Sequence, residues 1–235
     1  MRDYERVYKS MNAVIYWSNT GESLKIAKYI AEKTGYELCE LMSLKEKNFD
    51  DIFLVFPIHY QSVPKTIVRP LKGLKFHKAV LVLTYGKMKH GDVLNEAQKI
   101  LHSSVVGGAY VPCKHTYLLN DKSFNEFDKL DNVIALIDRD TEAIFTKQKR
   151  NIFAKILPNT RHRLSVTIYK NDDCVNCGEC NKVCSHIHNG VVDKHCIRCL
   201  KCYFACPHDA LEFELSPLLK DYLKNQKKCE IEIYI

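Results

Sequence analysis

Short apolar runs alternate with mixed polar and apolar stretches along the first 150 residues. The apolar runs predict five β-strands, over 12–17, 36–41, 51–56, 78–84 and 104–111. The intervening stretches predict helices, over 18–33 after an opening turn, 64–74, 92–102 and 124–149. Nearly continuous apolar strands that alternate with helices indicate a parallel sheet covered on both faces. We therefore expect an α/β fold with a doubly wound, five-stranded parallel sheet.

The pattern changes after residue 150. A basic linker is expected over 151–165, within a Lys147–Arg163 stretch that holds no acidic residue and is interrupted at Pro158-Asn159. A small cysteine-rich α+β domain is expected over 166–215, after a first domain of residues 1–150. A tail over 216–235 would add a short helix at 217–226. The alternating run 229–235 could pair as an edge strand.

Eight of the eleven cysteines lie between Cys174 and Cys206. They form the pattern CxxCxxCxxxC twice, with a constant offset of 22 residues. A disulfide scaffold would be smaller and its cysteines more evenly spread, so clustering argues for a metal. The remaining three cysteines, Cys39, Cys113 and Cys229, are interpreted as small buried apolar residues.

Each repeat has the spacing of a [4Fe–4S] ligand set. Three cysteines two residues apart can wrap one face of an iron–sulfur cube, and the fourth ligand comes from the partner repeat. One cluster would use Cys174, Cys177, Cys180 and Cys206. The other would use Cys196, Cys199, Cys202 and Cys184. The second repeat ends in Cys-Pro, whereas the first ends in Cys184-Ser185, which departs from the usual pattern without removing a ligand.

This segment resembles the bacterial-type 2[4Fe–4S] ferredoxins, which implies low-potential transfer of single electrons. The alternative that the clusters only brace the fold stays open. Four histidines lie near the ligands, and solvated loop positions are the favoured interpretation for them: His186, His188, His195 and His208.

The segment Ser18-Asn19-Thr20-Gly21-Glu22-Ser23 follows the first strand and opens the first helix. A helix N-terminus presents unpaired N–H groups and a partial positive charge to an anion. Three hydroxyl side chains could add donors, and the glycine lets the loop bend close to a ligand. Because no lysine follows, this is not the GxxxxGK[ST] nucleotide loop. A monoester phosphate, such as that of FMN, suits it.

At this point the domain resembles flavodoxins, whose first loop has a similar T-G-x-[ST] core. Two later loops match in position, Pro57–Ser62 after the third strand and Thr84–Lys87 after the fourth. The resemblance implies that these loops flank the isoalloxazine ring. The expected cofactor residues are Ser18, Asn19, Thr20, Gly21, Glu22, Ser23, Pro57, His59, Tyr60, Thr84, Tyr85 and Gly86. Tyr60 and Tyr85 are the candidates for stacking, and Lys87 and Lys89 would favour a reduced, anionic flavin.

Charge and hydropathy exclude several classes of function. The formal net charge is +7, from 35 basic and 28 acidic residues, and two clusters of about −2 each would lower it to about +3. The basic stretch contains a single aromatic residue, Phe153. Binding of single-stranded nucleic acid needs several aromatic side chains among the basic ones, so nucleic-acid binding is not expected. No apolar run reaches the ~18 residues of a membrane span, and the N-terminus does not read as a secretory signal. We therefore expect a cytoplasmic protein.

The whole chain resembles the flavodoxin–ferredoxin fusion proteins of anaerobic microbes. The resulting hypothesis is an electron carrier that passes electrons between two [4Fe–4S] clusters and FMN, with redox donor and acceptor proteins, among them acidic ones, as partners. One alternative is a flavin-dependent reductase of a small molecule. Another is a partner-binding protein with structural clusters. With no nucleophile–base pair and no GxGxxG fingerprint, a carrier is favoured over a substrate-specific oxidoreductase.

Overall fold

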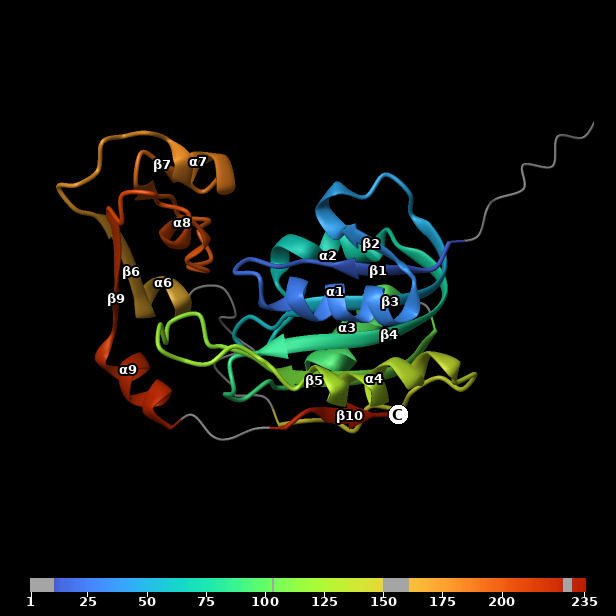
Figure 1. The fold of residues 1–235 in the computed structure, drawn as a ribbon. Helices are drawn as coiled ribbons and strands as arrows, with labels where there is room; N and C mark the ends of the chain where they lie inside the picture. The colour runs from blue at the N-terminus through green and yellow to red at the C-terminus, as the bar shows by residue number, and fades with distance from the viewer. Residues whose placement is uncertain (1–10, 103, 150–160, 226–229) are drawn as a thin grey trace, which may run out of the picture.

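The computed structural model describes residues 11–102, 104–149, 161–225 and 230–235 (Figure 1). An α/β unit built on one central sheet occupies the N-terminal part. A smaller C-terminal unit lies beyond the carboxyl ends of the parallel strands, in orange and red in Figure 1. Among the described residues, no helix combines the length and the apolar character needed to cross a bilayer.

The central sheet has the strand order β10-β5-β4-β3-β1-β2. Its parallel strands are β1 (Ala13–Tyr16), β2 (Glu37–Glu40), β3 (Asn48–Pro57), β4 (Lys75–Tyr85) and β5 (Val105–Pro112). This 2-1-3-4-5 order is that of flavodoxin-like folds, so the expected doubly wound sheet is confirmed. In addition, β10 (Glu232–Tyr234) pairs antiparallel with β5 as a sixth strand.

Alternating strand residues face two cores. On one face, Ala13 and Ile15 of β1 belong to a core that includes α2 (Lys65–Lys72) and α3 (Val93–Leu101). On the other face, Val14 belongs to the core of α1 (Glu22–Thr34). That face is completed by η2 (Phe127–Leu130), α4 (Asp131–Ile134) and η3 (Ala135–Asp138). The short η1 (Leu41–Ser43) follows β2.

The long helix expected over 124–149 is wrong, because helical structure ends at Asp138. Arg139 is extended, and its Nε donates a 3.1 Å hydrogen bond to the carbonyl of Val106. The N–H of Ala143 then donates to the carbonyl of Val105 at 2.7 Å. Ala143 and Phe145 are buried in the core on the opposite face of the sheet. Pairing with β5 and burial of these two side chains therefore replace the continued helix.

The C-terminal unit is closed by one antiparallel pair, β6 (Val166–Lys170) with β9 (Leu211–Leu215). Between them lie α7 (Glu179–Val183), β7 (Ile187–His188), β8 (Val191–Val192) and α8 (Lys201–Phe204). The helix α6 (Arg161–Ser165) precedes the pair, and the expected tail helix follows it as α9 (Pro217–Lys224). Most of the basic linker, residues 150–160, lies outside the described residues.

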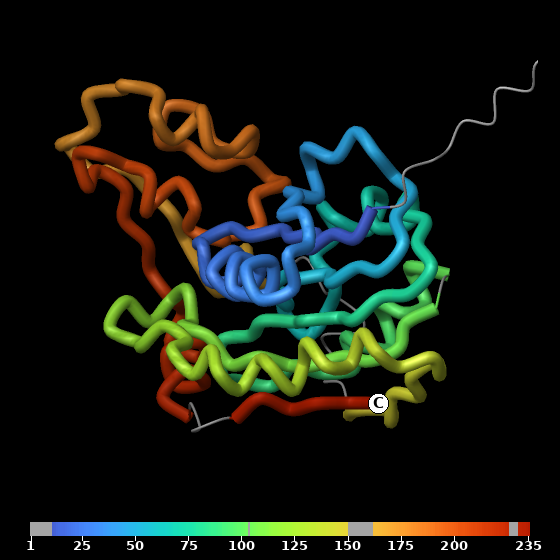
Figure 2. The backbone as a smooth tube through the Cα atoms, turned by 45° about the vertical axis from the view of Figure 1, so that its right-hand side comes forward, coloured from blue at the N-terminus to red at the C-terminus, as the bar shows by residue number. Residues whose placement is uncertain are grey.

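The tail returns from the C-terminal unit to the first sheet, and Figure 2 shows it beside β5. Tyr234 packs edge-on against Tyr110, with ring centroids 5.6 Å apart. The carboxylate of Glu232 lies 3.2 Å from Nε2 of His90. The chain therefore returns to the N-terminal sheet after the cysteine-rich unit.

Candidate functional site

The loop between β1 and α1 is shaped by a short hydrogen bond and a glycine. Gly21 has a φ of 91°, a conformation that favours glycine, and its N–H donates to Oγ of Ser18 at 3.1 Å. No side chain caps the N-terminus of α1, so the first-turn N–H groups face the end of the sheet without such a partner. Ser23 is buried, and its hydroxyl lies 2.8 Å from that of Thr84 at the end of β4.

The loop after β3 contains an unusual turn. His59 and Ser62 exchange two backbone hydrogen bonds, of 3.1 and 2.9 Å. The two central residues, Tyr60 and Gln61, have φ values of 51° and 63°. Positive φ at both central positions defines a type I′ turn, which normally uses glycine or asparagine. Bulkier residues in it are strained, and such strain tends to occur at functional sites.

His59 connects the first and second loops. Its Nε2 lies 3.3 Å from Nδ2 of Asn19, and its ring packs against the buried Trp17. Burial, together with the neighbouring His162, lowers the pKa of His59 to about 4. The imidazole is therefore neutral at physiological pH and serves as a hydrogen-bonding group without charge.

The loop after β4 contacts the loop after β5. A Cβ on Gly86 would lie 2.3 Å from Cδ2 of His115, so this position has no room for a side chain. Lys87 forms a 2.7 Å ion pair with Asp121. Of the two lysines expected to favour a reduced flavin, Lys89 lines the pocket described next and Lys87 does not.

A pocket of about 700 Å³ opens where these loops meet, at the carboxyl ends of the strands. Ligands bind in this place in open α/β sheets, and the volume is typical of a cofactor site. All the expected cofactor residues except Gly21 line it. Ile58 and Gln61 of the predicted second loop also line it, as does Lys89, which was expected near the flavin. The residues that the sequence analysis missed are Met88, Cys113, Lys114, His115, Thr116, Tyr117, Leu164, Ser165, Ile197, Arg198, Cys199, Ser216, Leu218, Leu219 and Tyr222.

The missed residues differ in how they could have been found. Residues 113–117 follow a predicted parallel strand, so their place at the same edge was a signal in the sequence. The residues from 164 onward belong to the C-terminal unit, and no local pattern points to them. Their presence makes the pocket a shared site of the two units.

Two tyrosines join the units at the pocket. Tyr117 donates its hydroxyl proton to the carbonyl oxygen of Arg198 at 2.8 Å. Its oxygen lies 3.1 Å from the hydroxyl of Tyr60, which must therefore be the donor in that pair. The pKa of Tyr117 is raised well above 10, first by burial and then by Tyr60 and the thiols of Cys199 and Cys196. Tyr117 thus lies between the flavodoxin-like loops and the second cysteine repeat.

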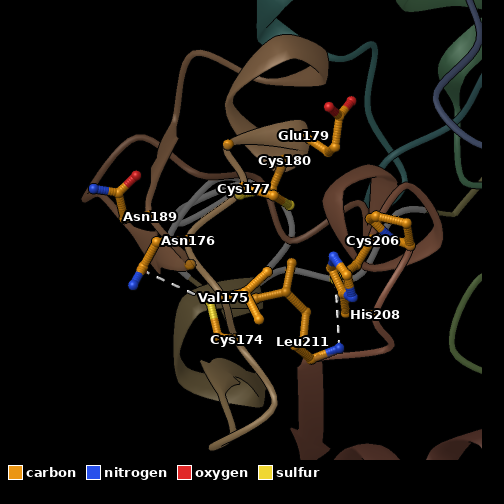
Figure 3. A pocket seen from close by; sticks show the side chains of 14 residues that line it. Cys174, Val175, Asn176, Cys177, Glu179, Cys180, Asn189, Cys206, His208 and Leu211 are labelled. Atoms are coloured by element: carbon orange, nitrogen blue, oxygen red, sulfur yellow. Dashed lines mark hydrogen bonds between the residues drawn. The ribbon is translucent and has the colours of Figure 1, made fainter.

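The first cysteine group surrounds a separate hollow, shown in Figure 3. Its lining includes four cysteines, Cys174, Cys177, Cys180 and Cys206. These are the four residues assigned to one cluster by the crossed spacing. The main-chain N–H of Ala210 donates to Sγ of Cys206 at 3.4 Å. Such N–H groups stabilise the negative charge of cluster sulfurs, so the local chemistry suits a cube.

The other four cysteines influence one another electrostatically. Burial, together with the thiols of Cys199, Cys196 and Cys184, raises the pKa of Cys202 to about 12. Buried thiols with such pKa values lose their protons when iron takes their place. Among the residues that the structure describes, no three metal-binding side chains surround a point that would hold a single ion. The two groups of four cysteines are the metal-binding candidates.

The two repeats have the same backbone shape. Asn176 and Arg198, which are 22 residues apart, have φ values of 55° and 56°. Gly178 and Leu200, with the same offset, have φ values of 77° and 61° and directly precede α7 and α8. The pseudo-symmetry expected from the spacing is therefore present in the fold. The assignment of each thiol to a cluster stays a prediction.

Comparison with known proteins supports the interpretation of the second cysteine repeat. Residues 191–212 match the family model of the 4Fe-4S binding domain, a segment that contains the second repeat. No curated protein matches the chain.

Three solved structures resemble the N-terminal part. A protein described as a flavoprotein, from Bacteroides uniformis ATCC 8492, is 16% identical, with 55% of this chain and 99% of that chain covered and a TM-score of 0.38. A flavodoxin from the domain Archaea is 12% identical over 54% and 92%, with a TM-score of 0.34. A short-chain flavodoxin associated with a PDU bacterial microcompartment is 10% identical over 55% and 95%, with a TM-score of 0.36.

The flavodoxin-like assignment rests on the strand order, which is independent of these likenesses. The chain combines a flavodoxin-like α/β unit with a C-terminal unit that contains a ferredoxin-type 4Fe-4S binding domain. These two units, and the pocket between them, define the class of chemistry to which the function belongs.

Proposed function

We propose that this protein is an electron-transfer iron–sulfur flavoprotein, which passes electrons between two [4Fe–4S] clusters and FMN. One observation carries the proposal. Cys199, a ligand candidate of one cluster, lines the same pocket as all three loops expected to hold the flavin. Two redox groups bound at these places would be neighbours within one protein.

The first loop is suited to the phosphate of FMN. It offers the uncapped N–H groups of α1 and the hydroxyls of Ser18 and Thr20. Ser23 has a supporting role, because its hydroxyl is already paired with Thr84 and fixes the loop against β4.

The second and third loops are suited to the isoalloxazine ring. Tyr60 is half-buried, lines the pocket and is held by the strained turn at 59–62. Tyr85 packs edge-on against His90 and Tyr110, with its ring mostly in the core. We therefore favour Tyr60 as the stacking residue. When bound, FMN would supply a two-electron centre, which two clusters can fill with one electron each.

The cysteines of both repeats would hold the clusters in the crossed arrangement given above. Backbone N–H groups stabilise their sulfurs, as in the 3.4 Å contacts from Arg198 to Cys196 and from His186 to Cys184. Redox donor and acceptor proteins, including acidic carriers, are the proposed partners. We also propose the cytoplasm as the compartment, because it keeps the thiols needed for cluster assembly reduced.

A second candidate is a reductase of a small molecule at the flavin. Large apolar side chains of α6 and α9 line the pocket although they are highly exposed, Leu164 at 79% and Leu218 at 84%. They could contact an apolar substrate lying over the ring. Turnover of an added organic acceptor that saturates with its concentration would favour this candidate over a carrier.

An anaerobic reductive titration of reconstituted protein tests the main proposal. We expect broad cluster absorbance near ~400 nm together with resolved flavin bands, bleaching in an ordered sequence. Riboflavin, which lacks the phosphate, is the matched control ligand and should bind at least tenfold more weakly. Cluster absorbance with no uptake of FMN would overturn the flavin part of the proposal.

A further inference from the structure

Arg198 connects the second cysteine repeat to the flavodoxin-like pocket through three of its groups. Its N–H donates to Sγ of Cys196 at 3.4 Å, and its carbonyl accepts the hydroxyl proton of Tyr117 at 2.8 Å. Arg198 is also one of the residues that line the pocket. One residue therefore contacts a cluster-ligand candidate and also lines the site proposed for FMN.

The backbone of Arg198 is in a conformation that arginine rarely adopts. The equivalent position of the first repeat is Asn176, with a φ of 55° against 56° at Arg198. Asparagine tolerates this left-handed region, whereas a long side chain there is strained. Positions where a residue conflicts with its local conformation are often functional, which directs attention to the guanidinium group.

The guanidinium group is only partly satisfied. Its Nε donates to the carbonyl of Val166 at 3.1 Å. Its Nη1 is covered from solvent and has no hydrogen-bond partner within the described part of the chain. An uncompensated donor of this kind costs roughly 1–3 kcal/mol, and more when it is charged. A ligand whose arrival shifts the guanidinium group towards an acceptor would recover that cost.

The charges that line the pocket favour an anionic ligand. His59 and His115 line it, and burial lowers the pKa of each to about 4, so both are neutral. The cations in the lining are therefore Lys89, Lys114 and Arg198. Lys114 donates to the carbonyl of Leu119, and Lys89 is exposed. Lys114 and Arg198 are both half-buried, and of the two only Arg198 has a covered donor atom without a hydrogen-bond partner among the described residues. A charge acts more strongly on a ligand at such a half-buried position.

We propose that Arg198 is a flavin-binding residue contributed by the iron–sulfur unit, and that it prefers the reduced, anionic isoalloxazine. Recognition would come from a charge-assisted hydrogen bond to the electron-rich edge of the ring. This inference rests on the proposed binding of FMN. If Arg198 binds the flavin, the flavin site is complete only when both units are present.

The test uses full-length protein with clusters and FMN. Arg198→Asn removes the charge and installs the residue found at the equivalent position of the first repeat, so the loop conformation is kept. The affinity for oxidised FMN is measured by quenching of flavin fluorescence, and the affinity for reduced FMN follows from the midpoint potential of the bound flavin. We expect oxidised FMN to bind within about threefold of the wild type, and reduced FMN to bind at least tenfold more weakly. A tenfold loss lowers the two-electron midpoint by about 30 mV.

Arg139→Asn is the matched control, because its Nε also donates to a backbone carbonyl at 3.1 Å but the residue does not line the pocket. Its midpoint should equal that of the wild type. An unchanged midpoint in Arg198→Asn overturns the inference while leaving FMN binding intact. Failure of the wild type to bind FMN overturns the proposed function instead. If Arg198→Asn loses iron, the flavin midpoint potential of Arg198→Lys is measured instead. A wild-type midpoint potential in Arg198→Lys supports recognition of the charge, and a lowered one overturns it.

Discussion

The hydroxyl of Tyr117 donates a 2.8 Å hydrogen bond to the backbone carbonyl of Arg198, across the boundary between the two units. Tyr117 lies in the loop that follows β5, whereas Arg198 belongs to the loop of the second cysteine repeat. Tyr117 is also part of the apolar cluster that contains Cys196 and Leu200. This contact holds the second cysteine group against the cofactor pocket.

Tyr117→Phe should weaken that junction. It leaves the carbonyl of Arg198 without its donor and removes the acceptor of Tyr60. Loss of a buried partner costs about 1–3 kcal/mol. We expect anaerobic urea unfolding to show this loss, together with slower reduction of the flavin. Tyr169→Phe is the control, because its 3.0 Å bond to Glu212 is exposed, and it should cost under about 0.5 kcal/mol. Equal effects of the two variants would contradict the junction.

Gly86→Ala should destabilise the pocket. The added Cβ would lie 2.3 Å from the His115 ring, and overpacking of this kind costs about 1–3 kcal/mol. We expect a lower midpoint of urea unfolding and weaker FMN binding in a fluorescence titration. Gly73→Ala is the matched control. Its Cβ would come no closer than 3.4 Å to any neighbour, the carbonyl oxygen of Pro70, and its φ of −85° suits alanine. A wild-type affinity for FMN in Gly86→Ala would contradict the close approach of these loops to the cofactor.

Double substitutions test the crossed cluster ligation. Cys177 and Cys206 are assigned to one cluster, so Cys177→Ser with Cys206→Ser should leave about four of the eight irons. Cys177→Ser with Cys184→Ser should remove both clusters. Iron and sulfide analysis after anaerobic reconstitution measures each. Cys39→Ser, outside both groups, is the control and should keep all the iron. The reverse pattern would mean that each repeat supplies all four ligands of its own cluster.

The free energy of unfolding should decrease as the pH is lowered, because buried histidines are held neutral in the folded state. Burial lowers the pKa of His115 to about 4 in the folded state, against about 6.5 when unfolded. Between these values the unfolded chain binds more protons, so stability decreases as pH falls from 6.5 towards 4. From pH 7.5 to 5.5 this one group should remove about 1.4 kcal/mol.

His115→Gln should abolish that share of the pH dependence while other histidines keep theirs. Fluorescence of the single tryptophan, Trp17, buried in the first core, follows urea unfolding of the α/β unit. The slope of unfolding free energy against pH is the readout, and the absolute stability is not. Identical slopes for the variant and the wild type would show that His115 is not held neutral.

Local patterns predicted most of the parts correctly. All five apolar runs form parallel strands. β1, β3, β4 and β5 are largely buried, as their nearly continuous apolar sequences predict, whereas β2 is a partly exposed edge strand. The prediction of a helix over 124–149 was wrong beyond Asp138. The spacing of apolar residues does not indicate that Ala143 and Phe145 pack into the core on the other face of the sheet. The turn at Tyr60 and Gln61 was also hidden, since neither residue favours positive φ.

The sequence by itself determined the strands of the parallel sheet and the presence of a ferredoxin-type iron–sulfur segment. The two complete cysteine patterns also predict the cluster ligands, and the loop Ser18–Ser23 predicts a phosphate site where a strand meets a helix. Only the tertiary structure decided that Cys199 and Arg198 reach the flavodoxin-like pocket and that β10 completes the first sheet. Those relationships depend on packing between surfaces far apart in the chain, and no short pattern of residues records which surfaces will meet.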